Sequence, residues 1–145
     1  MEGHKVTLRD RIKLHEGLRL QPYLCTAGAW TIGYGHQIRK HEKFTRLTID
    51  QAERLLDRDI ETAEAEARSM FPDSKYKNFT KNRRDVLTEL VFNLGLTRFR
   101  GFKRMISAIN GGDWQQAAAE LEDSKWYRQV GPNRGNTLVN LLREG

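Results

Sequence analysis

The longest regular pattern of apolar and polar residues runs through residues 48–71. Its apolar residues lie at positions 49, 52, 56, 60, 63, 67 and 70, and these steps of three and four place them on one face of a helix. Thr48 and Gln51 have the spacing of a capping box, and Phe71-Pro72 ends the pattern. The pattern predicts a helix that, at ~1.5 Å per residue, is about 35 Å long and connects two lobes.

The segment before this helix has two different patterns. Residues 7–16 have a partial apolar face that begins behind Thr7, and they predict a short helix. Residues 17–39 lose the helical spacing and are rich in Gly, Thr, Tyr and Trp, which is typical of a small antiparallel sheet with tight turns.

After residue 71, four apolar faces predict four more helices. The first ends at Gly95, the second stops at Asn110-Gly111-Gly112, and the third begins after Asp113. A short fourth helix is expected after a turn at Gly131-Pro132-Asn133.

This order of elements predicts an α+β fold in a single domain over residues 1–145. A small β-containing N-terminal lobe, about 15–50, is joined by the long helix to an all-helical C-terminal lobe, about 75–145, which helix 7–16 completes. With 145 residues, of which 38% are apolar, the chain is long enough for one buried core and too apolar for a disordered segment.

Three sequence features bear on the compartment of the protein. Cys25 is the only cysteine, so no internal disulfide can form and a reducing compartment is expected. Residues 1–5 have no apolar segment behind them, which argues against an export signal. The longest stretch without Lys, Arg, Asp or Glu, Leu20–Ile38, contains Pro22 and several glycines, so we expect no stable insertion into a membrane.

The net charge of +6 is concentrated in one region. Residues 75–104 contain nine Lys and Arg residues against Asp85 and Glu89, a net charge of +7, and the rest of the chain has a net charge of −1. Such a region attracts anions, and nucleic acid, a lipid headgroup or an acidic polymer of the bacterial envelope would each fit. A solvated helix face without a partner fits equally well, and no nucleic-acid-reading motif occurs, so we expect no nucleic-acid partner.

The residues with unusual chemistry are concentrated in residues 16–36. Glu16 closes the predicted helix 7–16, and a segment dense in glycine and aromatic residues follows. A glycosidase needs a carboxylic acid that stays protonated near neutral pH, whereas a glutamate at a helix end is more often a surface residue. The His and Cys residues have no metal-ligand spacing and no Gly-rich phosphate loop occurs, so we expect no metal and no cofactor.

This segment resembles the phage-type lysozymes, the endolysins of the T-even muramidase family. The family pattern is Glu-Gly, then Tyr-x-Asp, then Gly-x-x-Thr-Ile-Gly-x-Gly-His. The matching residues here are Glu16-Gly17, Tyr23, Gly28 and Thr31-Ile32-Gly33-Tyr34-Gly35-His36. Further likenesses follow in the same order through nearly the whole chain, including Leu47-Thr48, Val91–Gly95, Ser124–Tyr127 and Pro132–Arg134.

The resemblance implies a lysozyme-like fold and hydrolysis of the β-1,4 bond between N-acetylmuramic acid and N-acetylglucosamine in peptidoglycan. Phe92 falls on a position in the wall of the family's substrate cleft, which makes it a candidate sugar contact. Arg134 matches an arginine that pairs with the catalytic glutamate. His36 and Asp59 resemble a structural ion pair of the family.

The resemblance places Glu16 on the general acid and Thr31 on the residue that helps to hold the attacking water, but Cys25 stands where the family has a catalytic aspartate. A thiol has a reference pKa of ~8.5 against ~3.9 for Asp, so an unperturbed Cys25 is mostly uncharged at neutral pH. Its open roles are a base that activates water, a weak water-positioning group, a nucleophile or an inert cysteine. We favour water activation, because the family inverts configuration and needs room for water between the two groups.

We therefore expect a phage or prophage endolysin, a muramidase that lyses the host cell. The alternative is a catalytically impaired peptidoglycan-binding protein of the same fold. We expect the endolysin to be a monomer, to wait in the host bacterial cytoplasm, and to reach the periplasm and cell wall after a holin has opened a pore in the membrane.

Overall fold

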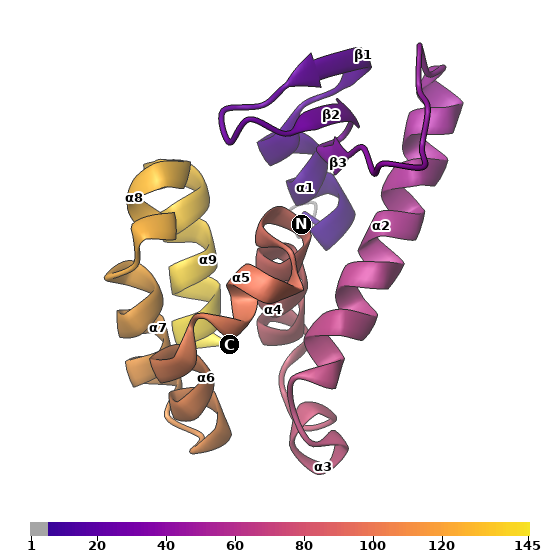
Figure 1. Ribbon diagram of the computed structural model, residues 1–145. Helices are drawn as coiled ribbons and strands as arrows, with labels where there is room; N and C mark the ends of the chain where they lie inside the picture. Colours follow the sequence, from indigo (N-terminus) through magenta and orange to yellow (C-terminus); the bar gives the residue numbers. More distant parts are fainter. Residues whose placement is uncertain (1–5) are drawn as a thin grey trace, which may run out of the picture. The chain divides into compact units, whose positions relative to one another are not determined.

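The computed structural model describes residues 6–145 (Figure 1), and the contacts within the chain divide it into two compact units. The first unit ends at Thr62 and the second spans Ala63–Gly145, so the division falls inside the long helix α2 (Ile49–Ser69). Residues 1–5, on which the expectation about an export signal rests, lie outside the described part. The expectations of a single domain and of a C-terminal lobe completed by residues 7–16 stay predictions.

The first unit contains a short helix and a small sheet, as the sequence predicts. Its elements before α2 are α1 (Leu8–Glu16), β1 (Arg19–Leu24), β2 (Trp30–Gly33) and β3 (His36–Gln37). The Thr7 hydroxyl oxygen accepts a hydrogen bond from Asp10 N at 3.1 Å and so caps the start of α1. The strands pair antiparallel in the order β1-β2-β3, and Pro22 is tolerated because β1 is an edge strand.

The register of β1 and β2 gives the sheet two different faces. Tyr23 lies opposite Thr31, and Leu24 lies opposite Trp30. Because successive side chains on a strand point to opposite faces, Tyr23 and Thr31 share one face while Leu24 and Trp30 share the other. Thr31 is buried, whereas Trp30 and Leu24 are more than half exposed, so the second face is open at this end of the two strands. Ile32, two residues after Trp30 on the same face, is completely buried.

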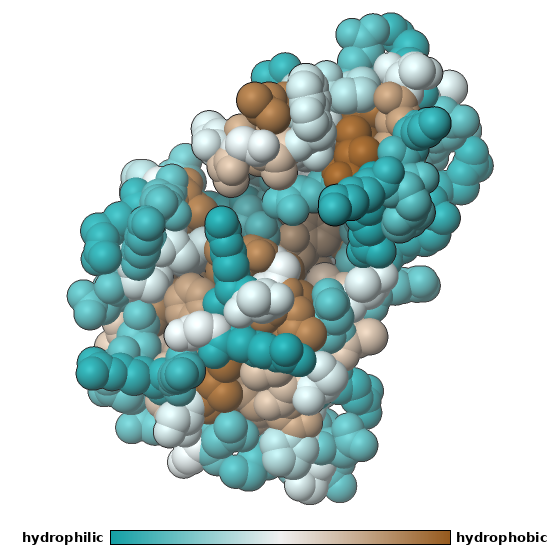
Figure 2. Space-filling view, in the orientation of Figure 1, coloured by the Kyte–Doolittle hydropathy of each residue, from teal (hydrophilic) through white to brown (hydrophobic). Residues whose placement is uncertain are grey.

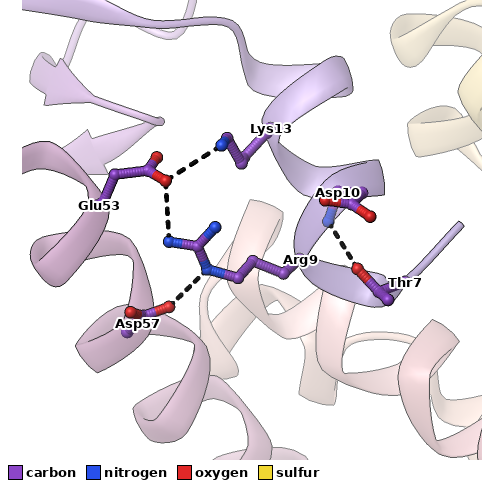
Figure 3. Close-up of polar contacts among 6 residues, drawn as sticks. All are labelled: Thr7, Arg9, Asp10, Lys13, Glu53 and Asp57. Atoms are coloured by element: carbon purple, nitrogen blue, oxygen red, sulfur yellow. Dashed lines mark hydrogen bonds and ion pairs between the residues drawn. The ribbon is translucent and has the colours of Figure 1, made fainter. Parts of the chain in front are cut away.

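Helix α2 begins at the predicted capping box. Thr48 N donates to Gln51 Oε1 at 2.9 Å, and Gln51 N donates to Thr48 Oγ1 at 3.1 Å. Its first half is joined to α1 by charged side chains, which Figure 3 shows: Arg9 donates to Glu53 and Asp57, and Lys13 donates to Glu53. The predicted long helix over residues 48–71 is therefore confirmed, with its last turn ending slightly earlier, at Ser69.

The second unit is helical and encloses an apolar core. Its elements after α2 are α3 (Asp73–Tyr76), α4 (Lys81–Leu94), α5 (Leu96–Arg100), α6 (Lys103–Asn110), α7 (Trp114–Glu122), α8 (Lys125–Val130) and α9 (Pro132–Glu144). Helix α9 packs against α7, α8 and α4, and α6 packs against α7. Helix α4 ends at Gly95, as predicted. Asp113 caps the start of α7, as predicted, because its Oδ1 accepts a hydrogen bond from Gln116 N at 3.0 Å. Within residues 6–145, no helix is both long and apolar enough to cross a bilayer.

The second unit differs from the expectations in two details. The short helices α3, α5 and α8 were not predicted as separate elements, because a helix of four to six residues is too short to show a helical period. The last helix begins at Pro132 itself rather than after a turn over Gly131-Pro132-Asn133. Proline is favoured at the first helical position, where its missing N–H has no helical partner to lose.

Candidate functional site

The side chain of Glu16, the last residue of α1, lies directly against the turn between β2 and β3. A Cβ atom on Gly35 in that turn would lie 2.7 Å from Glu16 Oε1 and 2.9 Å from Glu16 Cδ. Gly35 also has a φ of +77°, which disfavours any other residue. The missing side chain of Gly35 therefore makes the space in which the Glu16 carboxyl group lies.

Cys25 occupies the turn that joins β1 to β2. Cys25 N donates to Ala29 O at 3.0 Å, and Gly28 N donates to Cys25 O at 2.9 Å, so the backbone of the turn is closed on itself. Gly28 has a φ of +82°, which the tight turn requires. The thiol is half-buried in this turn.

The turn surrounds the Cys25 thiol with hydrogen-bond donors. Desolvation opposes ionisation of the thiol, but hydrogen bonds from the backbone of Ala29, the side chain of Thr31 and the backbones of Ala27 and Gly28 outweigh it. These donors favour the thiolate, so the pKa of Cys25 lies below its ordinary value. The turn is thus a local environment in which this thiol can act as a base.

Thr31, in the middle of β2, is 3% exposed and lies next to this turn. Its hydroxyl group donates to Ala29 O at 2.9 Å. A hydroxyl group has one proton and rotates freely, so it can donate either to this carbonyl or to the Cys25 thiolate, but not to both. Thr31 can therefore change partner when Cys25 gains or loses its proton.

Tyr23 links Glu16 and Cys25 electrostatically, and the sequence did not single it out as a site residue. Burial raises the pKa of Tyr23, and the negative charges of Glu16 and Cys25 raise it further. The Arg19 guanidinium, 4.8 Å from the ring centroid, acts in the opposite direction. Tyr23 occupies the tyrosine position of the family's Tyr-x-Asp pattern, two residues before Cys25, and this is the sequence signal that could have revealed its role.

His36, at the start of β3, is held between two carboxylates. Its Nδ1 lies 2.7 Å from Asp59 Oδ2, which is the pair that the family resemblance implied, and its Nε2 lies 2.9 Å from Glu42 Oε1. Desolvation lowers the pKa of His36, but the hydrogen bonds to Asp59 and Glu42 outweigh this, so its pKa is raised. Glu42 was missed in the sequence because it lies in a segment without a regular pattern.

The other two predicted site residues belong to the second unit. Phe92 lies on α4, half-buried at the edge of the apolar core. Arg134, near the start of α9, donates from Nε to Glu89 Oε2 at 3.0 Å, and Glu89 is completely buried. The expected pairing of Arg134 with Glu16 and the expected sugar contact of Phe92 stay predictions.

Several cations of the basic region 75–104 serve the fold of the second unit. Arg83 donates to Leu142 O at 2.8 Å and to Arg143 O at 2.9 Å, so it satisfies carbonyl groups at the end of α9. The Arg83 guanidinium also lies 4.5 Å from the ring of Trp114. Lys81 pairs with Asp85 at 3.0 Å. Among the described residues, no group of three or more His, Cys, Asp or Glu side chains is placed to hold a metal ion.

Comparison with known proteins gives one family match and several relatives. The profile of the family described as phage lysozyme matches residues 13–143. An endolysin of Acyrthosiphon pisum secondary endosymbiont phage 1 is 34% identical over 91% of this chain and 85% of its own length. A probable T4-type lysozyme 2 of Dictyostelium discoideum is 28% identical over 96% of this chain and 95% of its own length. The pre-baseplate central spike protein Gp5 of Enterobacteria phage T4 is 26% identical over 99% of this chain but only 29% of its own length.

The profile match spans nearly the whole chain, and it includes Glu16, the Cys25 turn and Thr31. The α+β fold, with a small antiparallel sheet and a helical second unit, is the one that the resemblance implied. The chain therefore belongs to the phage lysozyme family.

Proposed function

We propose that the protein is a muramidase of the endolysin type, which hydrolyses the β-1,4 bond between N-acetylmuramic acid and N-acetylglucosamine in bacterial peptidoglycan. Membership of the phage lysozyme family and the names of its relatives, lysozyme and endolysin, support this substrate class. The observation that carries the proposal is the Cys25 turn, whose donors favour a thiolate in the same unit that holds Glu16.

In the proposed reaction, the protonated carboxyl group of Glu16 gives its proton to the glycosidic oxygen as the bond to the anomeric carbon breaks. The Cys25 thiolate takes a proton from a water molecule, whose oxygen attacks the anomeric carbon from the opposite face of the sugar. The Thr31 hydroxyl group helps to hold that water. The reaction leaves a Glu16 carboxylate and a Cys25 thiol, and proton exchange with solvent restores the starting state.

The remaining family positions receive supporting roles in this proposal. Phe92 contacts the glycan, and Arg134 takes the place of the family's arginine that pairs with the catalytic glutamate. His36, between Asp59 and Glu42, holds β3 and so the turn that carries Gly35.

The proposal is tested by the release of muropeptides from purified sacculi. Glu16→Gln removes the proton that the leaving oxygen needs, and we expect a loss of roughly 10²–10⁴-fold. Cys25→Ala should lose activity by a similar order, whereas Cys25→Asp supplies another base and should keep much of it. Equal activity of wild type, Cys25→Ala and Cys25→Asp would show that the thiol has no catalytic role.

A nucleophilic Cys25 is distinguished by the stereochemistry of the product. Water activation inverts the anomeric centre, so NMR of the first product should show the α-anomer. A covalent intermediate retains the β-configuration, and mass spectrometry of rapidly quenched enzyme would find a glycan adduct on Cys25. Finding the β-anomer first would contradict the proposed role of the thiol.

A catalytically impaired binding protein is the second candidate, since Cys25 replaces the usual aspartate. Such a protein would bind sacculi and release no muropeptides. The same assay, with mass analysis of the released fragments, separates this candidate from the muramidase and identifies the bond that is cut.

Host lysis and the route to the wall form the last part of the proposal. The name of the endolysin relative supports a lytic role. To this we add, as our proposal, a monomeric enzyme that reaches the wall after holin-dependent release from the bacterial cytoplasm. Expression in a bacterial host, with and without a holin, tests this route: lysis should need both proteins, and lysis without the holin would contradict it.

A further inference from the structure

The outer face of the small sheet exposes apolar side chains. Leu24 and Trp30 form a cross-strand pair on the face opposite Thr31, and they are 57% and 58% exposed. Adjacent large apolar side chains on a surface mark an interaction site more often than isolated ones do. Figure 2 shows brown apolar side chains bordered by teal hydrophilic ones on the part of the molecule that carries the strands.

A shallow groove of about 430 Å³ runs beside Trp30 on this face. Its apolar lining comes from Pro22, Trp30, Ile38 and Phe44, so strands and the following loop contribute together. Its polar lining consists of charged side chains alone, and no Ser, Thr, Asn or Gln lines it among the described residues. The groove thus combines apolar and cationic side chains, which suits the boundary between acyl chains and anionic headgroups.

The rim of the groove is positively charged. Arg39, Lys40 and Lys43 line it, and in the part of the chain that the structure describes no ion pair or hydrogen bond involves the ammonium groups of the two lysines. The one acidic residue of the lining, Glu42, accepts hydrogen bonds from His36 Nε2 at 2.9 Å and from Arg39 N at 2.8 Å. Its charge is therefore directed toward the sheet, and the rim presents cations.

We propose that this face, the outer-face groove, is a peripheral contact site for a bilayer that carries anionic phospholipid headgroups. Trp30 and Leu24 enter the boundary between headgroups and acyl chains, a position that suits the amphipathic indole ring. Arg39, Lys40 and Lys43 contact the phosphate groups, and each cation near an anionic bilayer contributes roughly fivefold in affinity.

The contact does not involve the candidate site residues on the opposite face of the sheet. Thr31, and Tyr23 opposite it, point away from Leu24 and Trp30. Bilayer binding thus requires neither substrate nor turnover, and it can be measured independently of the proposed muramidase activity.

The full-length protein offers its own reporter for the test. Of the three Trp residues, Trp126 is 4% exposed and Trp114 is packed against the core of the second unit, so Trp30 is the one that solvent reaches most. Vesicles that contain phosphatidylglycerol should shift Trp emission to shorter wavelength, and brominated acyl chains should quench it. Vesicles of phosphatidylcholine alone should do neither.

Sedimentation with phosphatidylglycerol vesicles then compares matched charge variants. Lys40→Glu/Lys43→Glu should weaken binding by at least about tenfold. Lys77→Glu/Lys103→Glu makes the same charge change in the basic region of the second unit and should weaken it by less than about threefold, through net charge alone. Trp30→Ala, whose folding is checked by circular dichroism, should remove most of the emission shift and weaken sedimentation.

Three results would overturn the proposal. Equal losses in the two double variants would mean that only net charge drives binding. Unchanged sedimentation of Trp30→Ala would remove the outer-face groove from the contact. Failure to bind vesicles at low salt, together with Trp30-dependent binding to purified sacculi, would assign this face to the wall polymer instead.

Discussion

The two units of the molecule are stabilised by different interactions. In the second unit, apolar side chains from all the larger helices form one buried cluster, with Phe99 completely buried. The first unit also buries apolar side chains, such as Ile12, Ile32 and Leu56, but ion pairs join its elements as well. Arg9 and Lys13 connect α1 to α2, and His36 connects β3 to Asp59 and Glu42. The unit that holds Glu16 and Cys25 is therefore the one on which pH and salt act most strongly.

The largest expected effect lies in the apolar core. Phe99→Ala removes a completely buried ring and leaves a cavity, so the free energy of unfolding should fall by about 3–5 kcal/mol. Denaturant unfolding in low and high salt should give nearly the same loss, because no charge is involved. A loss that changes strongly with salt would contradict the contrast between the two units.

Gly35→Ala should produce the next largest effect, in the first unit. The new Cβ would meet Glu16 Oε1 at 2.7 Å, and the residue would also have to hold a φ of +77°. We expect muropeptide release to fall by about 100-fold or more, because the carboxyl group must move.

Gly112→Ala is the matched control for this change. Gly112 has a similar φ, +74°, but no atom lies within 4 Å of an added Cβ. This variant should lose about 1 kcal/mol of stability from backbone strain and keep its activity. Equal activity losses in both variants would show that strain, rather than the contact with Glu16, explains the effect.

The effect of pH on the free energy of unfolding, through His36 and its partners Asp59 and Glu42, should be intermediate in size. The folded state raises the pKa of His36 above 6.5, so its contribution to stability is complete below that pH and is lost as pH rises through the folded value. Desolvation raises the pKa of Glu42, but hydrogen bonds from the Arg39 backbone and from His36 outweigh it and hold the pKa below 4.5. The contribution of Glu42 to stability is therefore lost as pH falls through that lower value. The difference in unfolding free energy between wild type and His36→Gln should therefore be greatest between about pH 4.5 and 6.5. A difference that grows above pH 8 would contradict this.

The smallest expected effect is at the bridge between α1 and α2. Lys13→Met removes a partly exposed ion pair with Glu53, at 3.1 Å, and should lower the free energy of unfolding by about 0.2–1 kcal/mol at low salt. The loss should shrink at 1 M salt, where exposed charges are screened. A loss that stays constant with salt would mean that the Lys13 stem contributes by packing.

The sequence predicts the regular elements of both units well because their signals are local. The apolar period of α2 and its Thr48–Gln51 capping box lie within a few residues of each other. The sheet follows from the glycines and aromatic residues between Gly17 and residue 39. The four-residue helix α3 and the five-residue helix α5 are too short for any period to appear.

The environment of the candidate site could be predicted only in part. The family resemblance identifies Glu16, Cys25 and Thr31, but the contact of Glu16 with Gly35 joins residues far apart in the chain. The donors around Cys25 depend on the backbone path of one turn, which side-chain identity does not reveal. The same holds for Glu42, whose partner His36 follows from the path of the loop.

The central claim is that Cys25 works as an ionised base opposite the protonated Glu16, and the pH profile of muropeptide release tests it most directly. The working form needs an ionised base and a protonated acid together, so the profile is bell-shaped. Aspartic acid ionises at a lower pH than a thiol, so the optimum of Cys25→Asp should lie clearly below that of wild type. Identical optima for the two proteins would contradict the claim.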